Sequence, residues 1–195
     1  MDRETELALV QRLREGDPAA FDPVYDEFHG RLYNFLARLA RRRDVAEDLL
    51  EETWVRLVAS ARRLRPDTRL GPWLFTVARN LYVSYCRSRL LDESLSADLI
   101  GLWPVTARQP SPFEEVAASE LERRVECTLA ALPAIYREVL LLVGVAEFSP
   151  AEAAVVCGVT PEALRQRLSR ARAMLARELE ATPGHGIPSL SEVMT

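Results

Sequence analysis

One segment in the second half of the chain carries polar side chains whose types and spacing suit contact with base edges and phosphates. At about 100° per residue, a predicted helix there gathers these side chains on one face and its flanks. They are Glu162, Arg165, Gln166, Ser169 and Arg170. An arginine-rich helix of this kind has the size to enter a DNA major groove. Because the opposite face is apolar, the alternative is a packing helix with a solvated outer surface.

A second segment interleaves aromatic rings with arginine and asparagine on a helix predicted to begin at Pro72. Its candidate contact residues are Trp73, Arg79, Asn80, Tyr82 and Arg87. Bases of single-stranded nucleic acid stack on aromatic rings while guanidinium groups pair with phosphates. The preceding loop adds arginines that a purely structural role does not require, namely Arg62, Arg63, Arg65 and Arg69. Trp73 and Phe75 are, alternatively, core residues.

A third candidate is the acidic rim of a helix predicted over residues 44–61. Asp48, Glu51 and Glu52 lie on its exposed side, beside Trp54. A carboxylate rim can dock a protein partner, although acids near a helix start also stabilise the helix dipole. From these residues alone, a solvated helix start is favoured over a docking site.

Local signals place the first of these segments in a helix-turn-helix. Ser149-Pro150 predicts an N-cap followed by proline at the first helical position. Gly158 is predicted to adopt the left-handed conformation that ends this short helix. Thr160-Pro161 then begins the next helix, so the order of signals matches the helix-turn-helix motif.

Proline and glycine divide the chain into two helical regions, and nothing in either region indicates a strand. Residues 91–112 are rich in serine, proline and acidic side chains, which predicts a flexible acidic linker. Residues 181–195 contain two prolines and two glycines, which predicts a flexible tail. We therefore expect an all-α protein with two small helical domains, residues 1–90 and 113–180.

Charge alternates along the chain, although the net charge is only −4. Residues 1–30 contain 8 acids and 3 bases, whereas residues 31–89 contain 13 bases and 6 acids. Residues 91–159 contain 11 acids and 4 bases, and residues 160–177 contain 5 bases and 1 acid. Two basic segments can therefore meet an anion. All 25 basic residues are arginine, which suits phosphate contact or reflects a coding bias.

Composition disfavours several classes of protein. The hydrophobic share of 48% and the charged share of 28% argue against a disordered or fibrous chain. The longest apolar run, residues 139–146, is too short to span a membrane, and the start lacks signal-peptide character, so we expect a cytoplasmic protein. Cys86, Cys127 and Cys157 are expected to be buried thiols. Nothing indicates an enzyme, a metal site or a cofactor.

Three motifs in series resemble those of extracytoplasmic-function (ECF) sigma factors. These are small two-domain members of the sigma-70 family of bacterial RNA polymerase specificity subunits. The first motif is DVAEDLLEETW at 44–54, and the second is PWLFTVARN at 72–80. The third is Leu132-Pro133 with YREV at 136–139, ahead of the helix-turn-helix. The resemblance runs from about Ala20 to Glu180.

The resemblance implies a role for each candidate surface. Residues 1–90 would form a region 2 type domain that docks on core polymerase and recognises and melts the −10 element. Residues 113–180 would form a region 4 type domain that reads the −35 element. Docking is implied for Asp48, Glu51, Glu52 and Trp54. Binding of the −10 element is implied for Arg62, Arg63, Arg65, Arg69, Trp73, Arg79, Asn80, Tyr82 and Arg87. Binding of the −35 element is implied for Thr160, Glu162, Arg165, Gln166, Ser169 and Arg170.

The implied partners are core RNA polymerase, through the clamp helices and flap of its large subunits, promoter DNA and an anti-sigma factor, with no membrane insertion. Ser84 stands where the family commonly has aspartate, and LRQR at 164–167 departs from the usual recognition helix. The base preference of relatives therefore does not carry over. Two other hypotheses are a stand-alone helix-turn-helix regulator, which needs a dimer and a palindromic site, and a protein adaptor. The net negative charge predicts weak promoter binding by the isolated chain.

Overall fold

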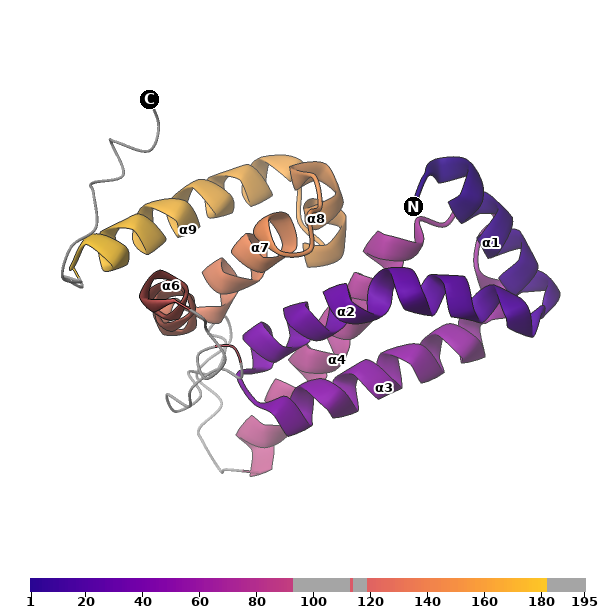
Figure 1. Cartoon of the computed structure of the whole chain (residues 1–195), viewed down its shortest axis with the longest axis horizontal. Helices are drawn as coiled ribbons and strands as arrows, with labels where there is room; N and C mark the ends of the chain where they lie inside the picture. Colours follow the sequence, from indigo (N-terminus) through magenta and orange to yellow (C-terminus); the bar gives the residue numbers. More distant parts are fainter. Residues whose placement is uncertain (93–112, 114–118, 182–195) are drawn as a thin grey trace.

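The structure is a computed structural model that describes residues 1–92, 113 and 119–181. The N-terminal bundle consists of α1 (Arg3–Glu15), α2 (Phe21–Ala40), α3 (Arg43–Ser60) and α4 (Leu70–Asp92), with 3-10 turns η1 (Pro18–Ala20) and η2 (Ala61–Arg63) (Figure 1). The C-terminal bundle consists of α6 (Glu120–Ala131), α7 (Ala134–Gly144), α8 (Pro150–Cys157) and α9 (Pro161–Ala181). Because the described residues include helices and no strand, the predicted all-α class is confirmed.

Two sequence predictions concern parts of the chain that the structure leaves undescribed. The predicted acidic linker, 91–112, lies outside the described residues from position 93 onward. The predicted tail, 181–195, lies outside them from position 182 onward.

The helix-turn-helix is built by local hydrogen bonds at its caps. The Ser149 hydroxyl accepts a hydrogen bond from the Glu152 N–H at 3.3 Å, and the Glu152 carboxylate accepts one from the Ser149 N–H at 3.0 Å. This reciprocal capping box fixes the start of α8. Gly158 ends α8 with a φ of 64°, and the Thr160 hydroxyl accepts from the Ala163 N–H at 3.2 Å to begin α9. The predicted caps and turn are therefore confirmed.

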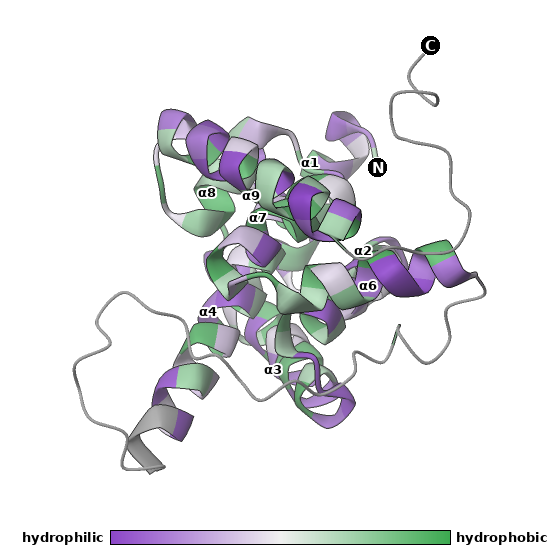
Figure 2. Cartoon of the chain, turned by 90° about the vertical axis from the view of Figure 1, so that its left-hand side faces the viewer, coloured by the Kyte–Doolittle hydropathy of each residue, from purple (hydrophilic) through white to green (hydrophobic). Residues whose placement is uncertain are grey.

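Helix α2 supplies the central apolar stripe of the N-terminal bundle. Its buried side chains recur every three or four residues, which keeps them on one face of the helix. They include Phe28, Leu32, Phe35, Leu36 and Leu39. Helices α3 and α4 pack against α2. In Figure 2, hydrophilic and hydrophobic residues alternate along the helices, which is the pattern of helices that bury one face. Burial of each such side chain stabilises the fold by about 1.5–3 kcal/mol.

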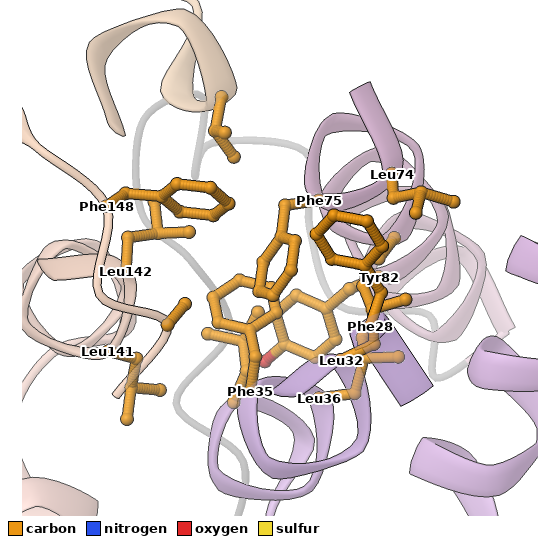
Figure 3. Packing of buried hydrophobic residues seen from close by; sticks show 14 of the residues in the cluster. Phe28, Leu32, Phe35, Leu36, Leu74, Phe75, Tyr82, Leu141, Leu142 and Phe148 are labelled. Carbon is orange, nitrogen blue, oxygen red and sulfur yellow. The ribbon is translucent and has the colours of Figure 1, made fainter. Parts of the chain in front are cut away.

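The two bundles share one continuous hydrophobic cluster, which the sequence does not reveal. Phe75 of α4 lies 5.3 Å from the Phe35 ring and 4.8 Å from the Phe148 ring, measured between ring centroids. Phe148 belongs to the loop before α8, so the ring of Phe75 connects the bundles (Figure 3). A Cβ at Gly71 would lie 3.2 Å from the ring atoms of Phe148 and Phe28, so glycine permits this close packing.

We expect Phe35→Ala to lower the free energy of unfolding by about 3–5 kcal/mol, because Phe35 is fully buried and its loss leaves a cavity beside Phe75. Equilibrium urea unfolding measures this change. Val58→Ala on the exposed side of α3 is the control and is expected to stay within about 0.5 kcal/mol. A loss below about 1 kcal/mol for Phe35→Ala would contradict the central position of this ring.

We expect Gly158→Ala to destabilise the protein by about 1–2 kcal/mol, because a side chain disfavours the left-handed backbone. An added Cβ there meets nothing within 4 Å, so the cost is one of backbone conformation. Gly30→Ala is the matched control, since Gly30 lies within α2 with no neighbour near its Cβ position. Alanine should stabilise that site by about 0.5–1 kcal/mol. Thermal unfolding that shifts in the same direction for both variants would refute the argument.

Candidate nucleic-acid interface

The loop between α3 and α4 forms a pocket of about 300 Å³. This volume is at the lower end of the range for small-molecule sites, about 300–1,000 Å³. Its lining is Ser60, Arg63, Leu64, Arg65, Thr68 and Trp73. Three of these residues, Arg63, Arg65 and Trp73, are among those predicted for the −10 element. Trp73, Arg63 and Arg65 therefore line one cavity. Arg63 donates to the Ala59 carbonyl oxygen at 3.2 Å, and Arg65 pairs with Asp67 at 3.2 Å.

Two residues of α1 accept or donate hydrogen bonds to this loop and to the start of α4, a feature that the sequence analysis missed. The Arg3 guanidinium donates to the carbonyl oxygens of Asp67, at 2.9 Å, and Thr68, at 3.3 Å. The buried Glu6 carboxylate accepts from the Leu70 N–H at 2.7 Å, which caps the start of α4. No local signal marks Glu6, because its partner lies 64 residues away along the chain.

The remaining residues predicted for the −10 element are divided between surface and interior. Arg62, Arg69, Asn80 and Arg87 are exposed, as are the pocket arginines. Tyr82 is 2% exposed, so in this arrangement its ring packs in the core and does not reach a nucleic acid. Its burial raises the pKa of the phenol, which keeps the hydroxyl neutral near pH 7.

Arg79 of α4 is bound within the molecule. Its Nε donates to Oε1 of Glu138, on α7, at 2.6 Å. The Glu138 side chain is completely buried and the Arg79 side chain is 17% exposed. Burial raises the pKa of Glu138, and the positive charge of Arg79 opposes that shift. Arg79 is therefore largely buried and paired with Glu138, whereas the arginines of the loop between α3 and α4 are exposed.

Helix α9 presents all of its predicted contact residues to solvent. Thr160, Glu162, Arg165, Gln166, Ser169 and Arg170 are exposed. On the opposite face, Leu164, Leu168 and Ala171 are buried, which confirms the predicted apolar stripe. Arg165 donates to Glu162 at 2.7 Å, one turn away on the same helix. This face is therefore stiffened by its own ion pair and open to a groove-sized partner.

The acidic rim on α3 continues into an apolar surface that the sequence analysis missed. Asp48 and Glu51 are exposed, while Glu52 is half-buried and accepts from Arg56 at 2.7 Å. Val55 and Val58, on the same side of the helix, are 59% and 64% exposed. The sequence could have revealed these two valines, because they do not fall on the helix face formed by the buried apolar residues of α3. Carboxylates and valines together suit a protein partner better than solvent alone.

Trp54 does not lie on this exposed rim, which corrects its predicted position. It is 7% exposed and packs with α2, where its ring centroid is 5.0 Å from Tyr25 and 5.6 Å from Phe21. The His29 ring lies 4.4 Å from Tyr25 and stacks on the Trp54 ring at 6.4 Å. Trp54 therefore supports the rim from below through aromatic packing.

A metal site and a membrane-spanning helix are both absent from the described part of the chain. No group of three or more His, Cys, Asp or Glu side chains could hold a metal ion there. Within the same residues, no helix has both the length and the apolar character needed to cross a bilayer. Cys86 and Cys157 are buried free thiols, and Cys127 is partly buried. Burial raises the pKa of Cys157 to about 12, so this thiol is a poor nucleophile.

Comparison with known proteins agrees with this arrangement. The family model "Sigma-70 region 2" matches residues 24–90, and the model "Sigma-70, region 4" matches residues 122–175. The ECF RNA polymerase sigma factor SigM of Bacillus subtilis is 32% identical over 154 residues, covering 79% of this chain and 91% of the relative. The ECF sigma factor EcfG of Rhodopseudomonas palustris is 35% identical over 143 residues, covering 73% and 75%.

Two solved structures share the fold. CnrH, in complex with the cytosolic domain of CnrY, matches with a TM-score of 0.69 and 22% identity over 92% of this chain and 99% of that one. The sigma factor RpoE of Bartonella quintana, in complex with the anti-sigma factor NepR, matches with a TM-score of 0.62 and 28% identity over 81% and 97%. These matches favour the sigma-factor hypothesis over a stand-alone regulator. The chain belongs to the ECF sigma factors of the sigma-70 family, which direct bacterial RNA polymerase to promoters.

Proposed function

We propose that this sigma factor uses three separate surfaces in promoter opening. The exposed side of α3 docks on the clamp helices of core polymerase, the pocket beside α4 captures an unpaired base of the −10 element, and the polar face of α9 reads the −35 element. Residues 1–90 and 113–180 then act as the region 2 and region 4 type domains. The chain acts by binding in the cytoplasm and not as an enzyme.

The observation that carries the proposal is the pocket lined by Trp73 and two arginines. Melting DNA requires unstacking that costs a few kcal/mol per step, and stacking of a flipped base on an aromatic ring returns about 1–3 kcal/mol. Arg63 and Arg65 line the same cavity, and their exposed contacts with the Ala59 carbonyl oxygen and with Asp67 can be exchanged for contacts with adjoining phosphates. The pocket therefore joins the two interactions that capture of a single strand needs.

The docking role rests on the composition of the α3 surface. Asp48 and Glu51 provide charge that steers and orients a basic partner, and Val55 and Val58 provide apolar area to bury. An anti-sigma factor that competes for this surface would need the same complementary features. The structures of CnrH and of the Bartonella quintana sigma factor, each bound to a partner protein, support such regulation here.

We expect the double variant Asp48→Arg, Glu51→Arg to bind core polymerase at least about tenfold more weakly, because like charges would face each other across the interface. Fluorescence anisotropy with labelled sigma factor measures the affinity. The control is Glu15→Arg, Glu120→Arg, which makes the same charge change at exposed sites on α1 and α6. Equal core affinities for the two double variants would contradict the docking surface.

We expect Trp73→Ala to reduce promoter opening by roughly 5- to 150-fold, the equivalent of about 1–3 kcal/mol of lost stacking. Permanganate reactivity of the −10 thymines in the holoenzyme complex reports opening, and run-off transcription gives the product. Trp73→Phe keeps an aromatic ring and should retain most activity. Core affinity serves as a folding control, since Trp73 also packs against the hydrophobic cluster. Wild-type opening by Trp73→Ala would refute base capture at this ring.

A further inference from the structure

We propose that α1 positions the pocket for base capture, because its Arg3 and Glu6 hold the loop between α3 and α4 in the shape that forms this cavity. The inference rests on the proposed function of the pocket, which Arg63, Arg65 and Trp73 line. Arg3 and Glu6 are not lining residues, so they act through the loop. They are therefore positioning residues, and we call the two side chains together the Arg3–Glu6 bridge.

The Arg3–Glu6 bridge binds backbone groups at the end of the loop. The Arg3 guanidinium donates through Nη2 to the Asp67 carbonyl oxygen at 2.9 Å and through Nη1 to the Thr68 carbonyl oxygen at 3.3 Å. Glu6 Oε1 accepts from the Leu70 N–H at 2.7 Å. A planar guanidinium group that spans two carbonyls, with a carboxylate on the amide that follows, restricts the peptide planes of residues 67–70.

The two side chains of the bridge also bind each other. Arg3 Nη1 lies 2.6 Å from Glu6 Oε2, and the two side chains are 42% and 10% exposed. Arg69 Nε lies 3.6 Å from the same oxygen. A buried carboxylate is costly unless its oxygens are bound, and both oxygens of Glu6 are. Loss of Arg3 would leave that buried carboxylate with a poorer set of partners, so the two side chains act as a unit.

The backbone that the bridge holds carries two walls of the pocket. Thr68 lines the cavity, and its N–H donates to the Arg65 carbonyl oxygen at 3.0 Å. Leu70 begins α4, and the Trp73 N–H donates to the Arg69 carbonyl oxygen at 3.0 Å, which places Trp73 in the first turn. A shift of residues 67–70 therefore moves both walls. A loop that is already fixed loses less conformational freedom when a base enters.

The other end of α1 also approaches this loop. Helix α1 ends at Gly16, whose φ is 82°, and a Cβ there would lie 3.3 Å from Nη2 of Arg62. Arg62 belongs to η2, which packs against α1. One helix thus contacts the loop near its beginning and, through Arg3 and Glu6, at its end. This arrangement lets α1 set the conformation of the whole segment.

The test compares Arg3→Gln with Arg14→Gln, which removes the same charge from the same helix. Arg14 donates to Gln11 within α1 at 3.0 Å. Holoenzymes are assembled on a promoter that the wild-type holoenzyme transcribes, and each template carries an abasic residue at one non-template position of the −10 element. The abasic penalty is the ratio of opening on the intact template to opening on the abasic one. Because it is a ratio within one preparation, a loss of folded protein cancels.

The captured position is the one at which the wild-type holoenzyme shows an abasic penalty of about tenfold and Trp73→Ala shows almost none. At this position, we expect Arg3→Gln to lower the penalty to below about threefold, because a displaced ring stacks less well on the base. Arg14→Gln should keep the wild-type penalty. Core affinity should stay within about twofold for both variants, since the proposed docking side of α3 is unchanged.

Hydrogen exchange gives a second measurement that needs no DNA. We expect the amides of residues 67–70 to exchange at least about fivefold faster in Arg3→Gln, while those of α2 keep the wild-type rate, because the bridge acts locally. Glu6→Gln should act in the same way, since an amide keeps the acceptor for Leu70 but lacks the charge that binds Arg3. The double variant should exceed the stronger single variant by no more than about twofold, as expected for one unit.

Three results would overturn the proposal, and they differ in what they leave standing. If no position of the −10 element shows a penalty that depends on Trp73, base capture is wrong and the bridge has nothing to position. If such a position exists and both Arg3→Gln and Glu6→Gln keep the full penalty there, positioning by α1 is wrong and base capture stands. Faster exchange throughout the chain would show a general loss of stability in place of a local role.

Discussion

The ring of Phe75 is the contact on which the arrangement depends, because it packs against Phe35 within the N-terminal bundle and against Phe148 from the C-terminal one. Helix α4 therefore serves three purposes on three faces. One face fills the core, one meets the other bundle, and one carries Asn80 and Arg87 to solvent. A rigid core beneath it holds the pocket residue Trp73 in place, and preorganised positioning of this kind limits the entropy lost on binding.

Some arginines of this chain have structural roles, beside those proposed to bind DNA. The Ala130 carbonyl oxygen accepts from Arg137 at 2.9 Å and from Arg41 at 3.1 Å, although both arginines are buried. Burial lowers the pKa of Arg137, and these hydrogen bonds compensate part of the lost hydration. The charge pattern of the sequence therefore cannot separate the arginines proposed to bind DNA from those that join the bundles. Only the position of a carbonyl or carboxylate partner distinguishes them.

How far the sequence predicts this protein depends on how local each signal is. The caps at Ser149 and Thr160 and the turn at Gly158 use partners a few residues away, so the helix-turn-helix could be predicted in detail. The side of α9 that faces the core followed from periodicity for the same reason. The burial of Tyr82, the bracing of the loop by Glu6 and the pairing of Arg79 with Glu138 all use partners 59 or more residues away or on other helices. Periodicity predicts which face of each helix is buried, but it does not predict which other element packs against that face.

The negative net charge of −4 and the buried position of Arg79 act in the same direction. Nonspecific affinity for DNA grows with the number of phosphates that a protein neutralises, so we expect an acidic chain with an arginine already paired to bind DNA weakly on its own. A partner that contributes positive potential beside the exposed arginines would raise this affinity. We therefore expect promoter binding by this chain to depend on core polymerase.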